Sequence, residues 1–147
     1  MVRLSKKLQK LRDQTDIQLA ENFKRKNELL DKGDFLDDDG YPTDDSLDII
    51  KLWHWDDARG WFKFIESLWA YHDWGWKEKD EPHEWEDLKQ YKDKTVHRYY
   101  ISTAGWSGNE SIIHAMQDNL MMWALNWYQS TRGGHHIFTL KEFNDGS

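Results

Sequence analysis

A nine-residue stretch, TAGWSGNES at residues 103–111, carries the groups best suited to chemistry. It joins a β-prone run to apolar residues at helical spacing, so it should form a turn that opens a helix. The first backbone N–H groups of a helix lack partners and can bind a phosphate or carboxylate, and glycines let a ligand approach them closely. The predicted ligand-binding residues are Ser102, Gly105, Trp106, Ser107, Gly108, Asn109 and Arg132.

The same turn has a purely structural interpretation, which we favour. Ser107 followed three residues later by Glu110 is the pattern of a capping box, in which the protein's own side chains satisfy the helix N–H groups. A nucleophile elbow is a third interpretation, because Asp118 and His135 follow in the chain order of such a hydrolase. Asp118 would lie about 16 Å along the same helix, so we expect no triad. The sequence leaves catalysis open but favours its absence.

Neither a metal site nor a cofactor is predicted. The chain has no cysteine, and its seven histidines lack the spacing of a metal-ligand set. The acidic loop GDFLDDDGYPTDDSLD fails as an EF-hand: with Gly40 at the sixth position, Phe35 and Ser46 stand where Asp and Glu are required. We favour a solvated turn in which Asp44 or Asp45 caps the next helix, and weak calcium binding stays an open alternative.

Ten tryptophans in 147 residues are the least ordinary feature of the composition. Those at helical spacing are expected in the core, whereas four stand in irregular, acidic surroundings. Exposed aromatic side chains bordered by charge are typical of interfaces. The predicted partner-binding residues are Trp55, Trp74, Trp76 and Trp85. This pattern favours binding over catalysis, with a different protein or another subunit as the partner.

A long amphipathic helix is predicted for the N-terminal segment. Apolar residues recur at helical spacing from Leu4 to Leu30, and Gly33 after Lys32 is a typical C-terminal signal. The apolar stripe is narrow, so this helix could pack on the rest of the chain or pair with a second copy in a coiled coil. A homo-oligomer through this helix is therefore one expected arrangement.

The remaining chain should combine helices with a few strands. Residues 46–72 predict two short helices, and a strand at 95–103, a helix over about 108–130 ended by a Gly-Gly pair, and a strand at HHIFTL follow. Because one helix carries the chain back, the two strands should run parallel. A third strand should come from residues 74–92 or from a neighbouring subunit.

The expected fold class is α+β: a mainly helical single domain with a small sheet, in which residues 95–140 form a β-α-β unit. We expect two parts, the amphipathic helix at 1–33 and one Trp-rich α+β domain at 34–147. The sequence contains no signal peptide and no run of membrane-spanning length, so no membrane partner is expected. The lack of cysteine agrees with a cytoplasmic location.

The net charge of −7 is unevenly distributed. Residues 1–33 hold nine Lys and Arg against five Asp and Glu, whereas residues 34–147 hold eleven against twenty-two. An acidic body repels phosphates, so nucleic-acid binding is not expected. Such a body could instead mimic nucleic acid toward a basic protein.

Three segments, DGYPTDDSLDIIKLW, YYISTAGWSGNESIIHAM and WYQSTRGGHHIFTL, resemble a group of small, uncharacterised proteins of tailed phages and prophages. The shared motifs are GYPT, STxGWSGNE and RGGH. Proteins of that group tend to have a second glycine where Ala104 stands and an arginine where Thr131 stands. The resemblance implies expression in the cytoplasm of an infected bacterium and a role directed at the host, such as blocking a defence system.

Two functions follow as expectations. The first is a non-enzymatic, phage-derived binding protein that docks a host protein through a Trp-rich acidic surface. The alternative is a small-ligand protein, for a nucleotide or phosphate, or a hydrolase, that uses the turn at residues 103–111.

Overall fold

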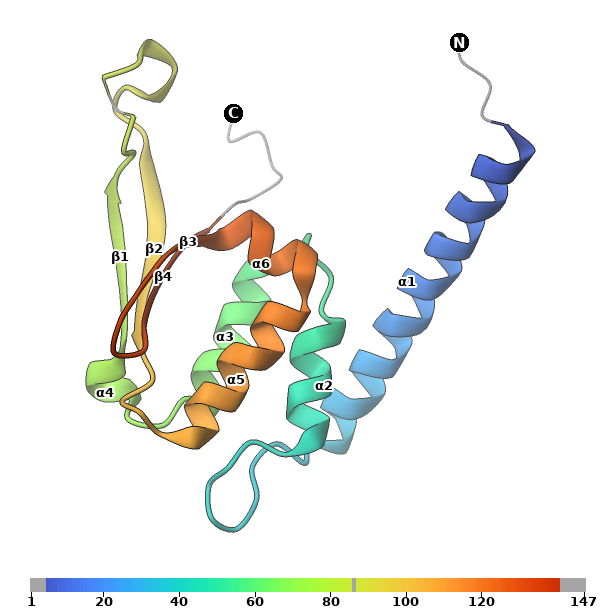
Figure 1. Ribbon diagram of the computed structural model, residues 1–147, viewed down its shortest axis with the longest axis horizontal. Helices are drawn as coiled ribbons and strands as arrows, with labels where there is room; N and C mark the ends of the chain where they lie inside the picture. The colour runs from blue at the N-terminus through green and yellow to red at the C-terminus, as the bar shows by residue number, and fades with distance from the viewer. Residues whose placement is uncertain (1–4, 86, 141–147) are drawn as a thin grey trace.

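The computed structural model describes residues 5–85 and 87–140 and confirms the α+β class (Figure 1). Leu4, the predicted first apolar residue of the long helix, lies outside the described residues. The helices are α1 (Lys6–Lys32), α2 (Asp44–Leu52), α3 (Ala58–Leu68), α4 (His72–Gly75), the 3-10 helix η1 (Lys89–Tyr91), α5 (Ser107–Asp118) and α6 (Leu120–Asn126). The strands are β1 (Trp76–Pro82), β2 (Thr95–Ser102), β3 (Trp127–Thr131) and β4 (His135–Thr139).

Several predicted elements are confirmed. The long helix α1 ends at Gly33, which adopts the left-handed φ of 73° and donates its N–H to the Leu29 carbonyl at 3.2 Å. The two short helices are α2 and α3, and the third strand is β1. The predicted cap of α2 is wrong: Thr43 is the N-cap, and Asp44 and Asp45 occupy the first turn, where the helix dipole favours carboxylates.

The predicted parallel pairing of the two strands is wrong. The sheet order is β1-β2-β4-β3, and every neighbouring pair is antiparallel. Helix α6 ends at Asn126, and the residues predicted to extend it form β3 instead. Gly133 and Gly134, expected to stop a helix, take φ values of 92° and 79° in the turn between β3 and β4. Strands β2 and β3 therefore point the same way, with β4 between them.

The single helix predicted over 108–130 is also interrupted at Asn119, which has φ −85° and ψ 79°. Its side-chain amide donates to the carbonyls of Ile50 and Trp53, both at 2.9 Å. Its side-chain oxygen accepts the N–H of Met122 at 3.4 Å and so caps α6. One buried asparagine thus ends one helix, starts the next and ties both to α2.

The core lies between one face of the sheet and the helices α3 and α5. Phe62 of α3 stacks on Tyr99 of β2 with ring centroids 4.0 Å apart, and it also contacts Phe138 of β4 at 5.4 Å. Trp61, fully buried, donates its indole N–H to the Ile50 carbonyl at 3.0 Å. Aromatic side chains of this size bury large apolar areas, which explains how a chain so rich in charge folds.

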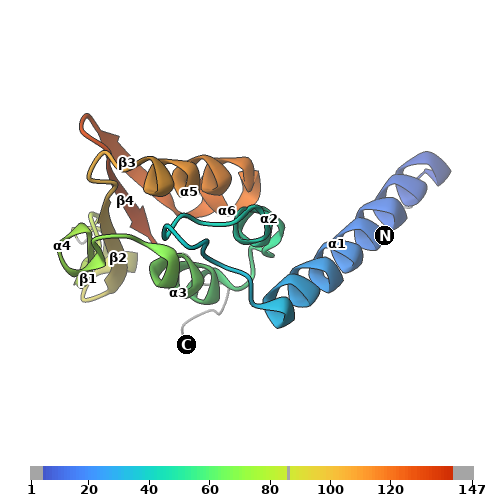
Figure 2. The same ribbon diagram turned by 90° about the horizontal axis from the view of Figure 1, so that it is seen from below.

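The elements form layers (Figures 1 and 2). Helices α3, α5 and α6 lie on one side of the sheet, α2 lies beyond them, and α1 is outermost. Of the described helices, only the short α4 lies beside the opposite face, at one end of β1 and β2. In the same part of the chain, no helix combines the length and apolar character needed to cross a bilayer.

We predict that Asn119→Ala lowers the free energy of unfolding by about 3 kcal/mol, because two buried carbonyls lose their donor and α6 loses its cap. Chemical denaturation monitored by tryptophan fluorescence measures the change. Gln117→Ala, an exposed position on α5, is the matched control. A loss no larger than that of the control would show that Asn119 does not join these helices.

Candidate functional site

The turn after β2 is bonded to the turn between β3 and β4. The Thr103 N–H donates to the Gly134 carbonyl at 3.0 Å, and the Thr103 hydroxyl donates to Glu110 at 2.6 Å. The capping box predicted from Ser107 and Glu110 is therefore wrong: Trp106 is the N-cap, without a side-chain bond, and Glu110 bonds Thr103. This junction of Thr103, Glu110 and Gly134 joins the STAGWSGNE and RGGH segments.

The start of α5 is covered by the chain itself. Trp106 folds its ring over Gly108, where an added Cβ would lie 2.2 Å from the indole. The ring also packs against Tyr41, with centroids 4.7 Å apart. The glycine thus makes room for a tryptophan of the same turn, in the place predicted for a ligand. Ser107 is exposed beside it, as the first residue of α5.

Asn109, another predicted ligand-binding residue, is fully buried. Its amide donates to the Ala70 carbonyl at 3.0 Å, and its oxygen accepts the Ala70 N–H at 3.0 Å. Ala104 and Gly105 take positive φ values of 58° and 71°, so the turn requires the left-handed conformation twice. Ala104 is the position where the resembling phage proteins tend to have glycine. Asn109 and this backbone geometry serve the fold of the turn.

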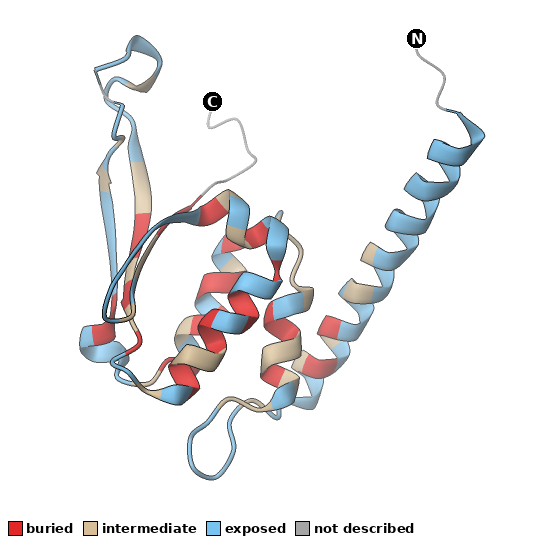
Figure 3. Cartoon of the chain, in the orientation of Figure 1, coloured by how far each residue is buried: buried red, intermediate tan, exposed pale blue. Residues whose placement is uncertain are grey.

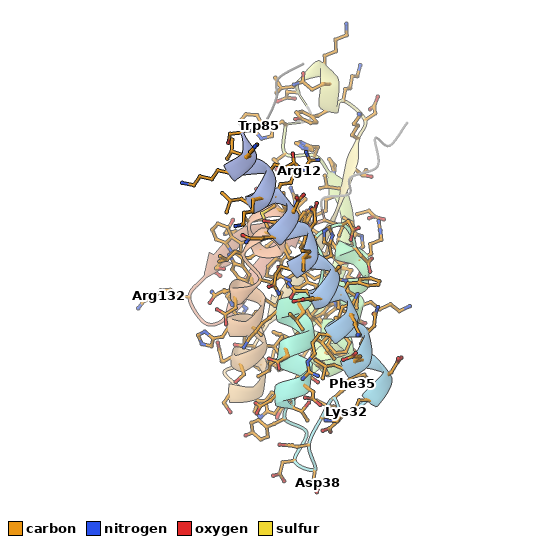
Figure 4. All side chains as sticks on the ribbon, turned by 90° about the vertical axis from the view of Figure 1, so that its right-hand side faces the viewer. Arg12, Lys32, Phe35, Asp38, Trp85 and Arg132 are labelled. Carbon is orange, nitrogen blue, oxygen red and sulfur yellow. The ribbon has the colours of Figure 1, made fainter. Side chains whose placement is uncertain are left out.

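A depression of about 270 Å³ lies on the open face of the sheet, which we call the sheet-face depression. It brings together Ser102 of the predicted ligand site and Trp74 of the predicted partner site, whose side chain is 56% exposed. Arg132 points outward from the β3–β4 turn (Figure 4). The lining residues are Trp74, Lys77, Tyr100, Ile101, Ser102, Gln129, Thr131, His135, His136 and Ile137.

The charge of this depression differs from that of the whole chain. Its lining includes Lys77 and no aspartate or glutamate. On the same face Tyr100 donates its hydroxyl to Glu81 at 2.6 Å, and Arg98 donates to Glu81 at 2.9 Å. The hydrogen bond from Tyr100, followed by that from Arg98, lowers the pKa of Glu81. The bond to Glu81 likewise raises the pKa of Tyr100. The Glu81 carboxylate is thus paired within the sheet.

The four predicted partner-binding tryptophans do not share one surface. Trp85, 61% exposed, is on the segment between β1 and β2 (Figure 4), and Trp55 is half-buried and stacked on His54 at 3.9 Å. Trp76 is only 7% exposed, because its register opposite Ile101 directs it into the core. Trp74 alone borders the sheet-face depression.

A cluster of titratable groups that the sequence did not reveal lies between β1, β2 and α3. The His97 ring bridges Asp80 and Glu78, with nitrogen–oxygen distances of 2.8 Å on both sides. Burial is the largest single influence and lowers the pKa of His97, but the bonds to both carboxylates outweigh it and the pKa is raised. Burial, and then a hydrogen bond with Glu78, raises the pKa of Glu66.

This cluster places the His97 imidazole between two carboxylates. Glu78 and Asp80 are two residues apart on β1, so their side chains point to the same face of the sheet. A strand prediction for residues 76–82 would have indicated this pair of carboxylates, but it would not have indicated that His97 lies between them. In the part of the chain that the structure describes, no group of three or more His, Cys, Asp or Glu side chains is arranged to hold a metal ion. The cluster links β1 and β2 through His97, and it reaches α3 through Glu66. The raised pKa of His97 makes this link sensitive to pH.

Comparisons of the chain with protein-family models, curated proteins and solved structures find no significant match. Function therefore has to be inferred from the residues and their geometry.

We predict that Gly134→Ala lowers the free energy of unfolding by about 3 kcal/mol, because its Cβ would lie 2.1 Å from the Thr103 hydroxyl and its φ is 79°. Gly133→Ala is the matched control: it has a similar φ of 92° but meets only the His135 ring, so it should cost about 1 kcal/mol. Thermal denaturation measures both. Equal losses would mean that the junction with Thr103 contributes nothing.

We predict that His97 makes stability depend on pH. A histidine whose folded pKa is raised above 6.5 stabilises the fold below about pH 6.5, and this contribution is lost as the pH rises through the folded pKa. In urea denaturation across pH 5.5–8.5, the unmodified chain should lose more stability with rising pH, or gain less, than His97→Gln does. Burial lowers the pKa of His136, which contributes the opposite slope, but it does so in both proteins. His114→Gln, an exposed histidine on α5, should keep the original slope. If stability changes with pH to the same extent in His97→Gln and His114→Gln, His97 does not cause the pH dependence.

Proposed function

We propose that the protein is a non-enzymatic binding protein that docks a protein partner on the open face of its sheet, with Trp74 as the anchor. The observation that carries this proposal is the exposure of Trp74 beside the sheet-face depression, on a face that the helical layer leaves uncovered. A large, half-exposed aromatic side chain at the edge of a concavity is typical of the few residues that dominate binding energy.

The size of the depression favours a protein partner over a small molecule. Its volume of about 270 Å³ is at the lower limit of the roughly 300–1,000 Å³ typical of small-molecule sites, and it suits a single side chain of a partner. Tyr100 and Ile137 contribute apolar surface, while Ser102, Gln129 and Thr131 contribute polar groups. Such a surface can take one apolar side chain of a partner and hydrogen-bond the chain around it.

The neighbouring edge of the sheet supports an extended partner segment. All residues of β3 are exposed, and its sequence WYQST carries no charge. The opposite edge strand, β1, reads WKEKDEP, and charges and proline on an edge discourage pairing with another chain. Beyond the irregularity between Trp127 and Gln129, strand β3 therefore offers backbone N–H and C=O groups to an added strand, next to the depression. Because Lys77 lines that depression and carboxylates do not, the bound segment should be neutral or acidic.

The class of partner to test first is a host protein of an infected bacterium, as the resemblance to phage proteins implies. The sequence analysis expected the docking surface to be acidic, but the lining of the sheet-face depression contains no aspartate or glutamate. Acidic side chains lie instead in the loop before α2, where Asp38 is exposed at the tip (Figure 4) and could contact a basic part of the same partner.

We predict that Trp74→Ala weakens partner binding at least about 10-fold, which corresponds to the loss of one anchoring aromatic side chain. Trp85→Ala, equally exposed but on the segment between β1 and β2, should bind as the unmodified chain does. Partners captured from host lysate by the unmodified chain are identified and then titrated against both variants by calorimetry.

Two results would overturn the proposal. The first is a captured partner whose affinity is the same for Trp74→Ala and the unmodified chain. The second is thermal stabilisation by free nucleotides that Trp74→Ala abolishes, since that would assign the depression to a small ligand.

A further inference from the structure

The N-terminal half of α1 projects away from the rest of the chain (Figures 1 and 3). The helix packs on α2 through its last turns, where Lys26 and Leu29 are buried. The Lys26 ammonium lies 4.8 Å from the Phe23 ring centroid and 4.4 Å from that of Trp53, which fixes α1 to the body at this point. Beyond it, Leu8 and Leu11 are 51% and 50% exposed.

Local interactions give this projecting segment little stability. Ser5 caps it through the Leu8 N–H at 3.2 Å, and Gln18 bonds Asn22 at 2.8 Å. Pairs of this kind contribute weakly, and most helical stability in proteins comes from packing of the apolar stripe. A helix of 27 residues whose apolar side chains Leu8 and Leu11 are exposed to solvent would be stabilised by a surface that buries them.

Such a surface exists beside α1 itself. A groove of about 380 Å³ runs between α1 and the junction of α5 with α6, and we call it the α1 groove. Leu120 and Met121 in its wall are 76% and 49% exposed, and Trp55 lines it as well. Asp56 and Asp118, both exposed, line it too. Lys51 is a further charged residue of the lining, so the α1 groove is largely apolar and holds two aspartates against one lysine.

We propose that the projecting half of α1 docks in the α1 groove of a second copy of this chain, reciprocally in a two-fold dimer. Lys6, Lys7, Lys10 and Arg12 surround Leu8 and Leu11, and the first acidic residue of the helix is Asp13. An apolar pair flanked by four cations complements an apolar groove whose charged residues, Asp56, Asp118 and Lys51, are acidic on balance. Reciprocal docking covers both exposed surfaces of both copies.

A coiled coil between two α1 helices fits the residues less well. On the strict heptad seam that starts at Leu8 and Leu11, the next positions are Thr15, Gln18 and Asn22, which are polar. Leu19 and Phe23, which continue the apolar stripe, each lie one position off this seam. A parallel pair would also place the two basic ends side by side, where like charges repel. Such a coil would leave Leu120 and Met121 uncovered. Docking in the α1 groove needs only Leu8 and Leu11 from the helix, keeps the two basic ends from lying side by side, and buries Leu120 and Met121. The α1 groove is separate from the sheet face.

Sedimentation equilibrium of the full chain tests the proposal. The unmodified chain should sediment at twice the monomer mass. Leu8→Asp with Leu11→Asp should weaken association at least about 100-fold, and so should Leu120→Asp with Met121→Asp. Leu88→Asp, 43% exposed on the β1–β2 hairpin, is the matched control and should leave the dimer intact. Circular dichroism confirms that each variant is folded.

Mixing the two double variants separates the arrangements. Under reciprocal docking, each mixed dimer keeps one intact helix facing one intact groove, so the mixture should associate more strongly than either variant alone. A monomeric unmodified chain would overturn the proposal. So would a dimer that survives Leu120→Asp with Met121→Asp, because that outcome assigns the contact to α1 alone.

Discussion

Phe62 of α3 stacks on Tyr99 of β2 with ring centroids 4.0 Å apart, and this contact joins the helical layer to the sheet. It also determines which face of the sheet is turned toward solvent. Tyr99, Ile101 and Phe138 face the helices from adjacent strands, so the main apolar packing of the sheet is on one side. A sheet of four short strands has only one helical layer here, and its other face is left to solvent or to a partner. The sheet-face depression is a consequence of that one-sided packing.

The motifs that first suggested chemistry turn out to build the fold. Thr103 bonds both Gly134 and Glu110, and Asn109 bonds the backbone of Ala70 on both sides. These contacts join β2, α5 and the β3–β4 turn, which are far apart in the sequence. A glycine-bracketed turn before a helix predicts available N–H groups, but the side chain of Trp106 already covers Gly108. Whether this turn is an open anion site or a covered helix start depends on the rotamer of Trp106, which the spacing of residues in the sequence does not indicate.

The sequence predicted the elements whose signals are local and missed those that depend on distant partners. Periodicity and Gly33 located α1, and apolar spacing located α2 and α3. The interruption at Asn119 was missed because its bonds reach the carbonyls of Ile50 and Trp53, which no local pattern indicates. Strand β3 was missed because its residues continue the helical spacing. Trp74 and Ser102, which were predicted for two different sites, line one depression. The burial of Trp76 and the position of His97 opposite Asp80 follow from strand register, which local patterns do not indicate.

The two proposed surfaces lie on opposite sides of the helical layer: the sheet face lies on one side, and α1 with its groove on the other (Figures 1 and 2). Occupation of one therefore leaves the other accessible. A dimer joined through α1 would carry two sheet faces on one rigid assembly. Two copies of a modest site bind a partner with repeated segments far more tightly than one copy does, because the second contact forms at a high effective concentration. Self-association through α1 would in this way strengthen docking at Trp74 without any new contact there.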